Sequence, residues 1–339
     1  MKLLWLDLNS SYAHSSLALP ALHAQIADDT TIEWCIVSAT INENTGMVVS
    51  RIHKHRPDII AATNWLFNHE QLLHIISRAK ALLPHCCIVL GGPEFLGNNE
   101  AFLYKNKFVS GVFRGEGEEV FPQWLKVWNH SKETWKAITG LCYLDENGRY
   151  QDNGIARVMN FSQLVSPEKS CFFNWSKPFV QLETTRGCFN TCAFCVSGGE
   201  KPVRTIPLEA IRERLNDIHQ HGIKNVRVLD RTFNYNNKRA KELLDLFRQY
   251  PDICFHLEIH PALLSEELKQ ELSVLPKGLL HLEAGIQSLK ESVLQQSHRI
   301  GKLSDALEGL KYLCSLKNME THADLIAGPV SYTHLTLPT

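Results

Sequence analysis

The sequence predicts an α/β protein made of an open, doubly wound parallel sheet followed by part of a barrel of alternating strands and helices. Its 339 residues correspond to about two domains at roughly 100–200 residues each. In both halves, short apolar segments alternate with amphipathic ones, and such alternation produces parallel strands joined by right-handed crossovers. The alternation stops over residues 131–178, so we expect a connector there, between a first domain at 1–130 and a second at 179–329.

The composition excludes several other classes of protein. Hydrophobic residues make up 44% of the chain and charged residues 21%, which argues against a disordered, collagen-like or coiled-coil protein. A net charge of −1 gives no overall basic field to attract nucleic acid, so we expect no nucleic-acid partner. The apolar runs are far shorter than the roughly 20 residues of a membrane span, and Asp7 interrupts any signal-peptide core. We therefore expect a cytoplasmic protein without membrane contact.

The first domain contains five strand candidates that are apolar almost throughout, as in a sheet buried on both faces. They cover residues 3–8, 32–39, 58–64, 86–91 and 108–114, with the clearest helices at 69–83 and 118–129. Sheets of this type bind ligands at the carboxyl ends of their strands. Polar and glycine-rich segments follow the strands there, at residues 9–12, 64–65, 91–94 and 114–118.

The connector and the second domain have their own local signals. Glu146, Asn147 and Gly148 predict a hairpin turn within the connector. Five strand–helix repeats in about 150 residues then predict part of a barrel, whose reactive groups lie at the carboxyl ends of its strands. Ser288 and Glu291 have the spacing of a capping box. The predicted strands are 179–184, 225–230, 253–259, 279–286 and 321–327, and the helices are 207–221, 236–249, 265–275, 289–296 and 305–316.

The last ten residues differ from the rest of the chain. From Pro329 onward the sequence carries neither a helix nor a strand pattern, and it resembles the translated adapter sequence found in fragmentary reading frames. We therefore expect an interrupted natural frame, with residues 330–339 non-native or disordered. We also expect Leu335 and Leu337 to be poorly packed.

Three of the ten cysteines are clustered. Cys188, Cys192 and Cys195 directly follow the first strand of the predicted barrel. Soft thiolates at this density suit zinc or an iron–sulfur cluster. A structural zinc site normally has four protein ligands, and the next cysteines along the chain are the distant Cys171 and Cys254. Three thiolates on an iron–sulfur cluster leave one iron open for another ligand, so the spacing favours a cluster.

The arrangement Cys-x3-Cys-x-Phe-Cys, with Phe194 before the last cysteine, resembles the signature of radical S-adenosylmethionine enzymes. The resemblance implies a (β/α)6 barrel, here lacking its last strand, and a [4Fe-4S] cluster on Cys188, Cys192 and Cys195. It further implies that the open iron binds S-adenosylmethionine. One electron, from an external donor such as flavodoxin or ferredoxin, cleaves that molecule to a 5′-deoxyadenosyl radical.

The same resemblance implies further contacts to S-adenosylmethionine. The family's second strand often ends in Gly-Gly-Glu, which binds the methionine amino group; Asp230 stands near that place here, and a carboxylate can accept from an ammonium. Glu258 lies near the end of the third strand, like family residues near the methionine or ribose of the cofactor. The fourth strand ends in Gln287 and Ser288, similar to the family's Gly-x-Gln/Glu-Ser, and Arg299 stands where the family places a basic contact to the carboxylate. Phe194 would shield the cluster, and no further catalytic residue is predicted.

The first domain resembles the flavodoxin-like cobalamin-binding domain of the cobalamin-dependent radical subfamily. This implies cobalamin as a second cofactor, used for methyl transfer or related radical chemistry. The loop after the first strand lacks the Asp-x-His-x-x-Gly that supplies an axial histidine in many cobalamin domains. That absence fits the radical subfamily, which binds cobalamin without a protein histidine, and equally a domain that has lost the cofactor. The residues expected at the macrocycle, with glycines that let backbone approach it, are Ser11, Tyr12, Gly91, Gly92, Glu94, Gly115 and Glu116.

Two alternative functions stay open. A methylthiotransferase-like enzyme acting on tRNA or a ribosomal protein would pair a similar first domain with the barrel and use no cobalamin. Such enzymes hold a second cluster on three cysteines of the first domain, and Cys35, Cys86 and Cys87 do not fall on three successive loops. A non-catalytic, zinc-binding module is the other alternative. The sequence names no substrate, and a small molecule is the expectation.

Overall fold

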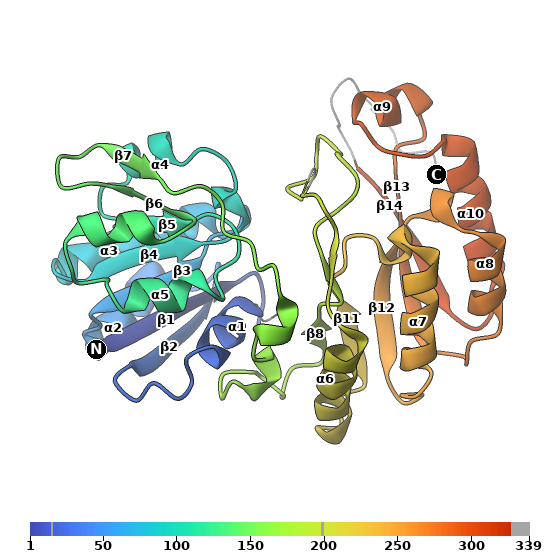
Figure 1. Ribbon diagram of the computed structural model, residues 1–339, viewed down its shortest axis with the longest axis horizontal. Helices are drawn as coiled ribbons and strands as arrows, with labels where there is room; N and C mark the ends of the chain where they lie inside the picture. Colours follow the sequence, from blue (N-terminus) through green and yellow to red (C-terminus); the bar gives the residue numbers. More distant parts are fainter. Residues whose placement is uncertain (15, 198–199, 327–339) are drawn as a thin grey trace. The chain divides into compact units, whose positions relative to one another are not determined.

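The computed structural model describes residues 1–14, 16–197 and 200–326. The chain divides into two compact units, Met1–Lys177 and Pro178–Thr339, and each unit is built around its own mainly parallel sheet (Figure 1). Among the described residues, no helix is long and apolar enough to cross a membrane. The predictions for residues 330–339, including Leu335 and Leu337, lie outside the described part of the chain.

The first unit contains a seven-stranded sheet in the order β2-β1-β3-β4-β5-β6-β7. The first five strands are parallel, and the order 2-1-3-4-5 is that of a flavodoxin-like doubly wound sheet with its switch point between β1 and β3. The predicted fold of this half is therefore confirmed. These strands are β1 (Lys2–Asn9), β2 (Glu33–Thr40), β3 (Ile59–Thr63), β4 (Cys87–Gly91) and β5 (Gly111–Phe113).

Both faces of this sheet are covered by helices. Successive residues of β1 alternate between two hydrophobic clusters, with Leu4 and Leu6 in one and Leu3 and Trp5 in the other, because strand side chains point to opposite faces in turn. The first cluster includes residues of α2 (Thr45–His55), α3 (His69–Leu82) and α4 (Glu100–Lys105), and the second residues of α1 (Ala18–Ala24) and α5 (Val120–Leu125).

The segment expected to be a connector belongs largely to the first unit. It forms the hairpin predicted around Gly148, with strands β6 (Leu141–Leu144) and β7 (Tyr150–Asp152), and β6 pairs antiparallel with β5. The hairpin joins this sheet because pairing there buries apolar side chains. Three consecutive residues, Leu141 to Tyr143, are fully buried at this edge of the sheet. The compact unit accordingly extends to Lys177. Three short 3-10 helices complete the segment, at Lys132–Ala137, Phe161–Gln163 and Pro167–Lys169.

The second unit contains five parallel strands in the order β8-β11-β12-β13-β14. Each lies within the strand range expected from the sequence or within one or two residues of it, as do the five helices that follow them. The strands are β8 (Val180–Leu182), β11 (Asn225–Val228), β12 (Cys254–Ile259), β13 (Leu280–Gln287) and β14 (Glu320–Leu325); the helices are α6 (Leu208–Gln220), α7 (Asn237–Phe247), α8 (Glu266–Ser273), α9 (Glu291–Gln296) and α10 (Leu303–Ser315).

The two faces of the second sheet differ in character. On β12, Phe255 and Leu257 are buried, whereas the alternate residues His256 and Glu258 are only partly buried and polar. β13 repeats this alternation along its whole length. Helices run beside these strands in Figure 1, and α10 contacts β13 and β14. In a barrel wall the apolar face is the one that the helices cover, and the polar face is the one that the barrel would enclose.

Candidate functional site

The cysteine loop, defined here as the described residues 187–197 and 200, lies between two short paired strands. β9 (Thr185–Arg186) and β10 (Arg204–Thr205) pair antiparallel, so the loop leaves and returns at nearly the same point. The backbone N–H of Cys188 donates to the carbonyl oxygen of Glu200 at 2.9 Å, which closes the base of the loop. The described part of this loop carries all three clustered cysteines directly after β8 and β9, as the sequence predicts.

The three thiols have different surroundings. Cys188 and Cys192 are buried, whereas Cys195 is exposed. Burial, together with the nearby Cys195 and Cys188 sulfurs, raises the pKa of Cys192, and Arg299 opposes that rise. The sulfurs therefore lie close enough to influence one another electrostatically. Two sheltered thiols and one open thiol, with Phe194 partly exposed beside them, form a donor set that fits an iron–sulfur cluster approached from solvent.

A second segment, residues 297–300, holds the cysteine loop in place. The backbone N–H of Ala193 donates to the carbonyl of Ser297 at 3.0 Å, and the N–H of Ile300 donates to Oδ1 of the buried Asn190 at 3.0 Å. Asn190 was not singled out in the sequence, because a loop asparagine between cysteines carries no distinctive pattern.

Arg299 joins this loop to the end of β13. Its Nη1 lies 4.0 Å from Sγ of Cys192, and its Nη2 donates to the carbonyl oxygen of Gly285 at 2.6 Å. The structure thus brings together Arg299, the end of β13 and the cysteine loop, three of the features that the sequence assigns to one site.

Gln287 ends β13 with an unusual backbone. Its φ of 68° lies in the left-handed region, where a residue other than glycine is held at a cost of about 1–3 kcal/mol and often marks a functional site. A side chain at Gly285 would place its Cβ 2.3 Å from Nε2 of Gln287. The Gln287 amide therefore folds back over Gly285 and occupies the space that a larger residue would fill.

Ser288 is buried, but the predicted capping box with Glu291 is not formed. Helix α9 begins at Glu291, and Oγ of Ser288 accepts from the N–H of Lys290 at 3.2 Å. Glu291 instead accepts from the N–H of Leu303, at the start of α10, at 2.8 Å. The predicted capping box is wrong because the Glu291 carboxylate accepts from a backbone N–H at the start of α10.

Asp230 is placed differently from the expectation. Its buried carboxylate accepts hydrogen bonds from the N–H groups of Thr184 and Thr185, at 2.8 and 2.9 Å, and from the Thr184 hydroxyl. Burial raises its pKa, and these hydrogen bonds act in the opposite direction. The carboxylate is engaged within the protein, at the backbone that leads into the cysteine loop, rather than directed to a ligand amino group.

Glu258 lies on the polar face of the second sheet, next to another carboxylate. It is the register partner of Glu283 on β13. Burial and the charge of Glu283 raise the pKa of Glu258 to about 7, although Arg231 and Arg227 act against the rise. This carboxyl is therefore poised to change protonation near neutral pH, which is typical of residues in functional sites.

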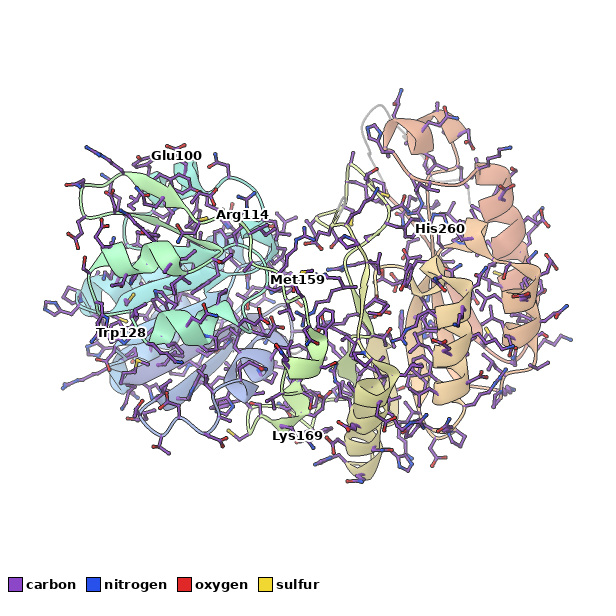
Figure 2. The ribbon with its side chains drawn as sticks, viewed as in Figure 1. Glu100, Arg114, Trp128, Met159, Lys169 and His260 are labelled. Carbon is purple, nitrogen blue, oxygen red and sulfur yellow. The ribbon has the colours of Figure 1, made fainter. Side chains whose placement is uncertain are left out.

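The ends of β11 and β12 are tied together beside this face. The Asn234 side chain donates to the carbonyl of His260 at 2.9 Å and accepts from its N–H at 2.8 Å. His260 (Figure 2) is buried, and neither ring nitrogen has a hydrogen-bond partner among the described residues. Burial, with a smaller contribution from the Arg299 charge, lowers its pKa to about 4.

In the first unit, Asn68 fixes the switch point of the sheet. Its side chain donates to the carbonyls of Leu8 and Thr63, at 3.0 and 3.1 Å, and accepts from the N–H of Trp65 at 2.8 Å. These contacts join the carboxyl ends of β1 and β3. The sequence signal was available, since an asparagine directly before a predicted helix is a typical helix-start residue.

The glycines expected at a macrocycle are required first by the chain itself. Gly115 has a φ of 103°, and a Cβ there would lie 2.2 Å from the carbonyl oxygen of Ala156; at Gly92 it would lie 2.5 Å from that of Asn64. Glu116 likewise accepts from the N–H of Val158 at 2.7 Å. Contacts within the chain therefore account for Gly92, Gly115 and Glu116 without a ligand. The two glycines were expected because they let backbone approach a macrocycle, whereas the structure requires them for close contacts within the chain.

The carboxyl edge of the first sheet also exposes apolar side chains. Tyr12 is 71% exposed and Leu66 82% exposed, and the rings of Trp65 and Phe67 stack with centroids 6.3 Å apart. The loop after β1 is ordered by a contact of 2.8 Å between Oγ of Ser11 and the His14 ring. Gly91 ends β4, and Glu94 lies in the following 3-10 helix, Pro93–Phe95. Trp65, Leu66 and Phe67 follow β3 at this edge, and no sequence pattern predicted a role for them.

Comparisons with known proteins agree with this division. Residues 182–329 match the model of the radical SAM superfamily, and residues 8–125 match the B12-binding domain. An uncharacterized methyltransferase of Pyrococcus horikoshii is 29% identical over 201 residues, 57% of this chain and 43% of that protein. The hopanoid C-3 methylase of Methylococcus capsulatus is 24% identical over 288 residues, 81% of this chain and 54% of that protein.

A solved structure shows the same fold. The cobalamin-dependent S-adenosylmethionine radical enzyme OxsB, with aqua-cobalamin and S-adenosylmethionine bound, aligns with a TM-score of 0.77 at 16% identity, covering 96% of this chain and 49% of that one. The chain spans about half the length of the curated relatives described above.

Proposed function

Because the chain belongs to the radical S-adenosylmethionine superfamily and carries a B12-binding domain, we propose that it is part of a cobalamin-dependent radical enzyme that transfers a methyl group. The cluster and S-adenosylmethionine would supply a 5′-deoxyadenosyl radical by reductive cleavage, and cobalamin would carry the methyl group. The observation that supports this proposal most strongly is the cysteine loop after β8 and β9, which carries all three cysteines and is held by residues 297–300.

Cys188, Cys192 and Cys195 would bind three irons of the cluster and leave the fourth open. Two of the sulfurs are buried, so their iron bonds would be sheltered from solvent. Arg299, 4.0 Å from the sulfur of Cys192, would offset the negative charge of the thiolates and would bind the carboxylate of S-adenosylmethionine. Its second guanidinium nitrogen is anchored on β13, which orients the group.

The remaining contacts to S-adenosylmethionine would come from the end of β13 and from the loop itself. Gln287 would present its amide from a strained backbone beside Gly285, and Ser288 directly follows it. Glu258, on the neighbouring strand, would contact the methionine or ribose, and Phe194 would cover the cluster. Asp230 would act indirectly, by fixing the backbone that leads into the cysteine loop.

Cobalamin would bind at the carboxyl edge of the first sheet, where the doubly wound fold offers its crevice. The exposed Tyr12 and the segment from Trp65 to Phe67 provide apolar surface for a macrocycle. Ser11, Gly91 and Glu94 lie on loops at the same edge. Gly92, Gly115 and Glu116 would shape these loops from within, because their own contacts are to the chain.

We further propose a small-molecule substrate and an external one-electron donor such as flavodoxin or ferredoxin. The named relatives include the hopanoid C-3 methylase, whose name describes methylation of a lipid-like small molecule. The donor is required because reductive cleavage consumes one electron, and the described side chains supply no redox group other than thiols.

Metal and cofactor analysis tests the proposal. Protein purified without oxygen and reconstituted with iron, sulfide and hydroxocobalamin is expected to contain about four irons for each cluster and to retain cobalamin through gel filtration. Cobalt absent from a cluster-loaded protein would contradict the cobalamin part and favour the methylthiotransferase-like alternative. Zinc in place of iron under the same conditions would contradict the enzyme and favour the binding module.

A further inference from the structure

Three side chains on the polar face of the second sheet bring metal-binding atoms together on the strands, separate from the cysteine loop. They are His256 on β12, Glu283 on β13 and His322 on β14, and their ligand atoms all lie within 4.8 Å of one another. Nε2 of His256 lies 2.9 Å from Oε2 of Glu283, and Nε2 of His322 lies 3.6 Å from the same oxygen.

The strand register explains the cluster. Glu283 and His322 are direct partners on the parallel strands β13 and β14, so their side chains leave the sheet side by side. His256 pairs with His281, two residues before Glu283 on the same face, because strand side chains alternate with a period of two. Residues separated by up to 66 positions in the sequence are thus fixed by three neighbouring strands rather than by mobile loops.

The spacing fits a tetrahedral metal ion. Zinc bonds of about 2.0–2.1 Å place neighbouring ligand atoms about 3.3 Å apart, which lies between the separations of 2.9 and 3.6 Å from Glu283. The two histidine ligand atoms lie within 4.8 Å of each other, so a small side-chain movement would bring the third pair to the same spacing. Two imidazoles and one carboxylate form a ligand set that leaves a fourth position for water. We propose that His256, Glu283 and His322 bind a divalent transition-metal ion, with zinc as the ion that their spacing fits.

His281 completes the arrangement as an orienting residue. Its Nε2 lies 2.8 Å from Nδ1 of His322, so His322 can donate its Nδ1 proton to His281 and keep Nε2 unprotonated for a metal. Metal-bound histidines almost always use their other ring nitrogen in this way. The ring of His281 also stacks on that of His256, with centroids 4.6 Å apart, which restricts both rings.

The charges around the cluster also suit a cation. Glu258 is the register partner of Glu283, and Asp324 lies two residues after His322 on β14, so three carboxyl groups share one face of the sheet. The positive charges of Arg227 and Arg231 act on Glu258, whereas His256 and His322 act on Glu283 and Asp324. His322 is 45% exposed, so an ion has a route to the site from solvent.

Zinc binding by the whole 339-residue chain tests this proposal. The cluster is first reconstituted anaerobically, so that the cysteines are occupied, and the protein is then treated with a weak chelator, titrated with Zn²⁺ and analysed for bound metal. We expect about one equivalent of zinc in addition to the cluster iron. In the protein with Cys188, Cys192 and Cys195 all replaced by alanine, where no cluster absorbs, Co²⁺ in place of zinc is expected to give visible d–d absorption without the near-ultraviolet band that a thiolate ligand produces.

Variants of the cluster provide the controls. His256→Ala and His322→Ala are expected to weaken zinc binding at least tenfold, and His281→Phe by about 10–100-fold, while iron content stays unchanged. His221→Ala, at the exposed end of α6, is the matched control and should bind zinc like the unaltered protein. A protein with Cys188, Cys192 and Cys195 all replaced by alanine should still bind about one zinc.

Several outcomes would overturn the proposal. One is a cluster-loaded protein that binds no zinc. Another is zinc binding that stays unchanged in His256→Ala and His322→Ala. A thiolate band in the cobalt spectrum would also overturn it, because the metal would then be on cysteine. None of these results depends on turnover, so the proposal is tested separately from the methyl-transfer function.

Discussion

The buried carboxylate of Asp230 accepts a hydrogen bond from the backbone N–H of Thr184 at 2.8 Å. A second N–H, from Thr185, reaches the same oxygen at 2.9 Å. One side chain just after β11 thus satisfies two backbone donors between β8 and the start of β9, shortly before the cysteine loop. The position that the family signature assigns to ligand binding is used here for support.

Replacing Asp230 by alanine is expected to destabilise the second unit. Two buried N–H groups would lose their acceptor, at about 1–3 kcal/mol for each unsatisfied group, so the free energy of unfolding should fall by about 2–6 kcal/mol. Chemical denaturation measures this, and cluster yield on reconstitution should fall with it. Asp252→Ala, which removes an exposed ion pair with Lys224, should change stability by less than about 1 kcal/mol. An Asp230→Ala protein of normal stability that has lost only its affinity for S-adenosylmethionine would contradict this account.

Gly285 and Gln287 provide a second prediction. In Gly285→Ala the new Cβ would overlap Nε2 of Gln287, which is the end of a flexible side chain, so the amide should swing away at a cost below about 1.5 kcal/mol. Affinity for S-adenosylmethionine, measured by equilibrium binding to the cluster-loaded protein, is expected to fall about tenfold, as after loss of one or two hydrogen bonds. Gly97→Ala, where nothing lies within 4 Å of the new Cβ, is the control. Unchanged affinity in Gly285→Ala would show that the Gln287 amide makes no contact with the ligand.

His260 makes stability depend on pH. Its pKa is lowered to about 4 in the folded protein, against an ordinary value near 6.5 in the unfolded chain. The unfolded chain therefore binds the proton more tightly, so the stabilisation from neutral His260 is complete above pH 6.5 and is lost as the pH falls toward 4. The loss over this window is about 3 kcal/mol at about 1.4 kcal/mol per pH unit.

Denaturation curves of His260→Leu and of the unaltered protein, recorded between pH 7 and pH 4, check this prediction. The variant should lose about 3 kcal/mol less stability on acidification. His74→Leu, on the exposed side of α3, should retain the acid dependence of the unaltered protein. Parallel curves for His260→Leu and the unaltered protein would refute the role given to this buried ring.

In the first unit, Gly115→Ala is expected to destabilise the protein even without cobalamin. The φ of 103° costs about 1–2 kcal/mol for a residue with a Cβ, and that Cβ would lie 2.2 Å from a backbone oxygen that cannot move aside easily. The total loss should exceed about 3 kcal/mol. Gly148→Ala, with a φ of 74° and nothing within 4 Å, should lose only the backbone cost. Thermal unfolding of both cobalamin-free variants distinguishes the two contributions, and equal losses would show that packing on Ala156 is unimportant.

Much of the fold could be predicted because the strands of both sheets are short apolar segments between turn signals. Three helices of the first unit were not predicted. Helices α1 and α4 are short, and α2 (Thr45–His55) ends in the polar sequence His-Lys-His. Its start was signalled by Asn44, whose side chain accepts from the N–H of Met47. The sequence could not show which sheet the β6–β7 hairpin joins, since antiparallel pairing with β5 is set by burial at the sheet edge.

The candidate site likewise has features that the sequence predicts and features that it cannot predict. The cysteine spacing is local, so it could be predicted from the sequence alone. The roles of Asp230 and of the glycines depend on which backbone atoms lie beside them, and no local pattern carries that information. The cluster of His256, Glu283 and His322 depends on the register of three strands, which the sequence does not specify.

The account as a whole depends on three cysteines that hold a [4Fe-4S] cluster and leave one iron open. Electron paramagnetic resonance of the reduced, reconstituted protein, recorded with and without S-adenosylmethionine, tests this most directly. Binding of the ligand to the open iron is expected to shift the g values of the cluster signal. A reduced protein without a cluster signal, or a signal that S-adenosylmethionine leaves unchanged, would contradict the account.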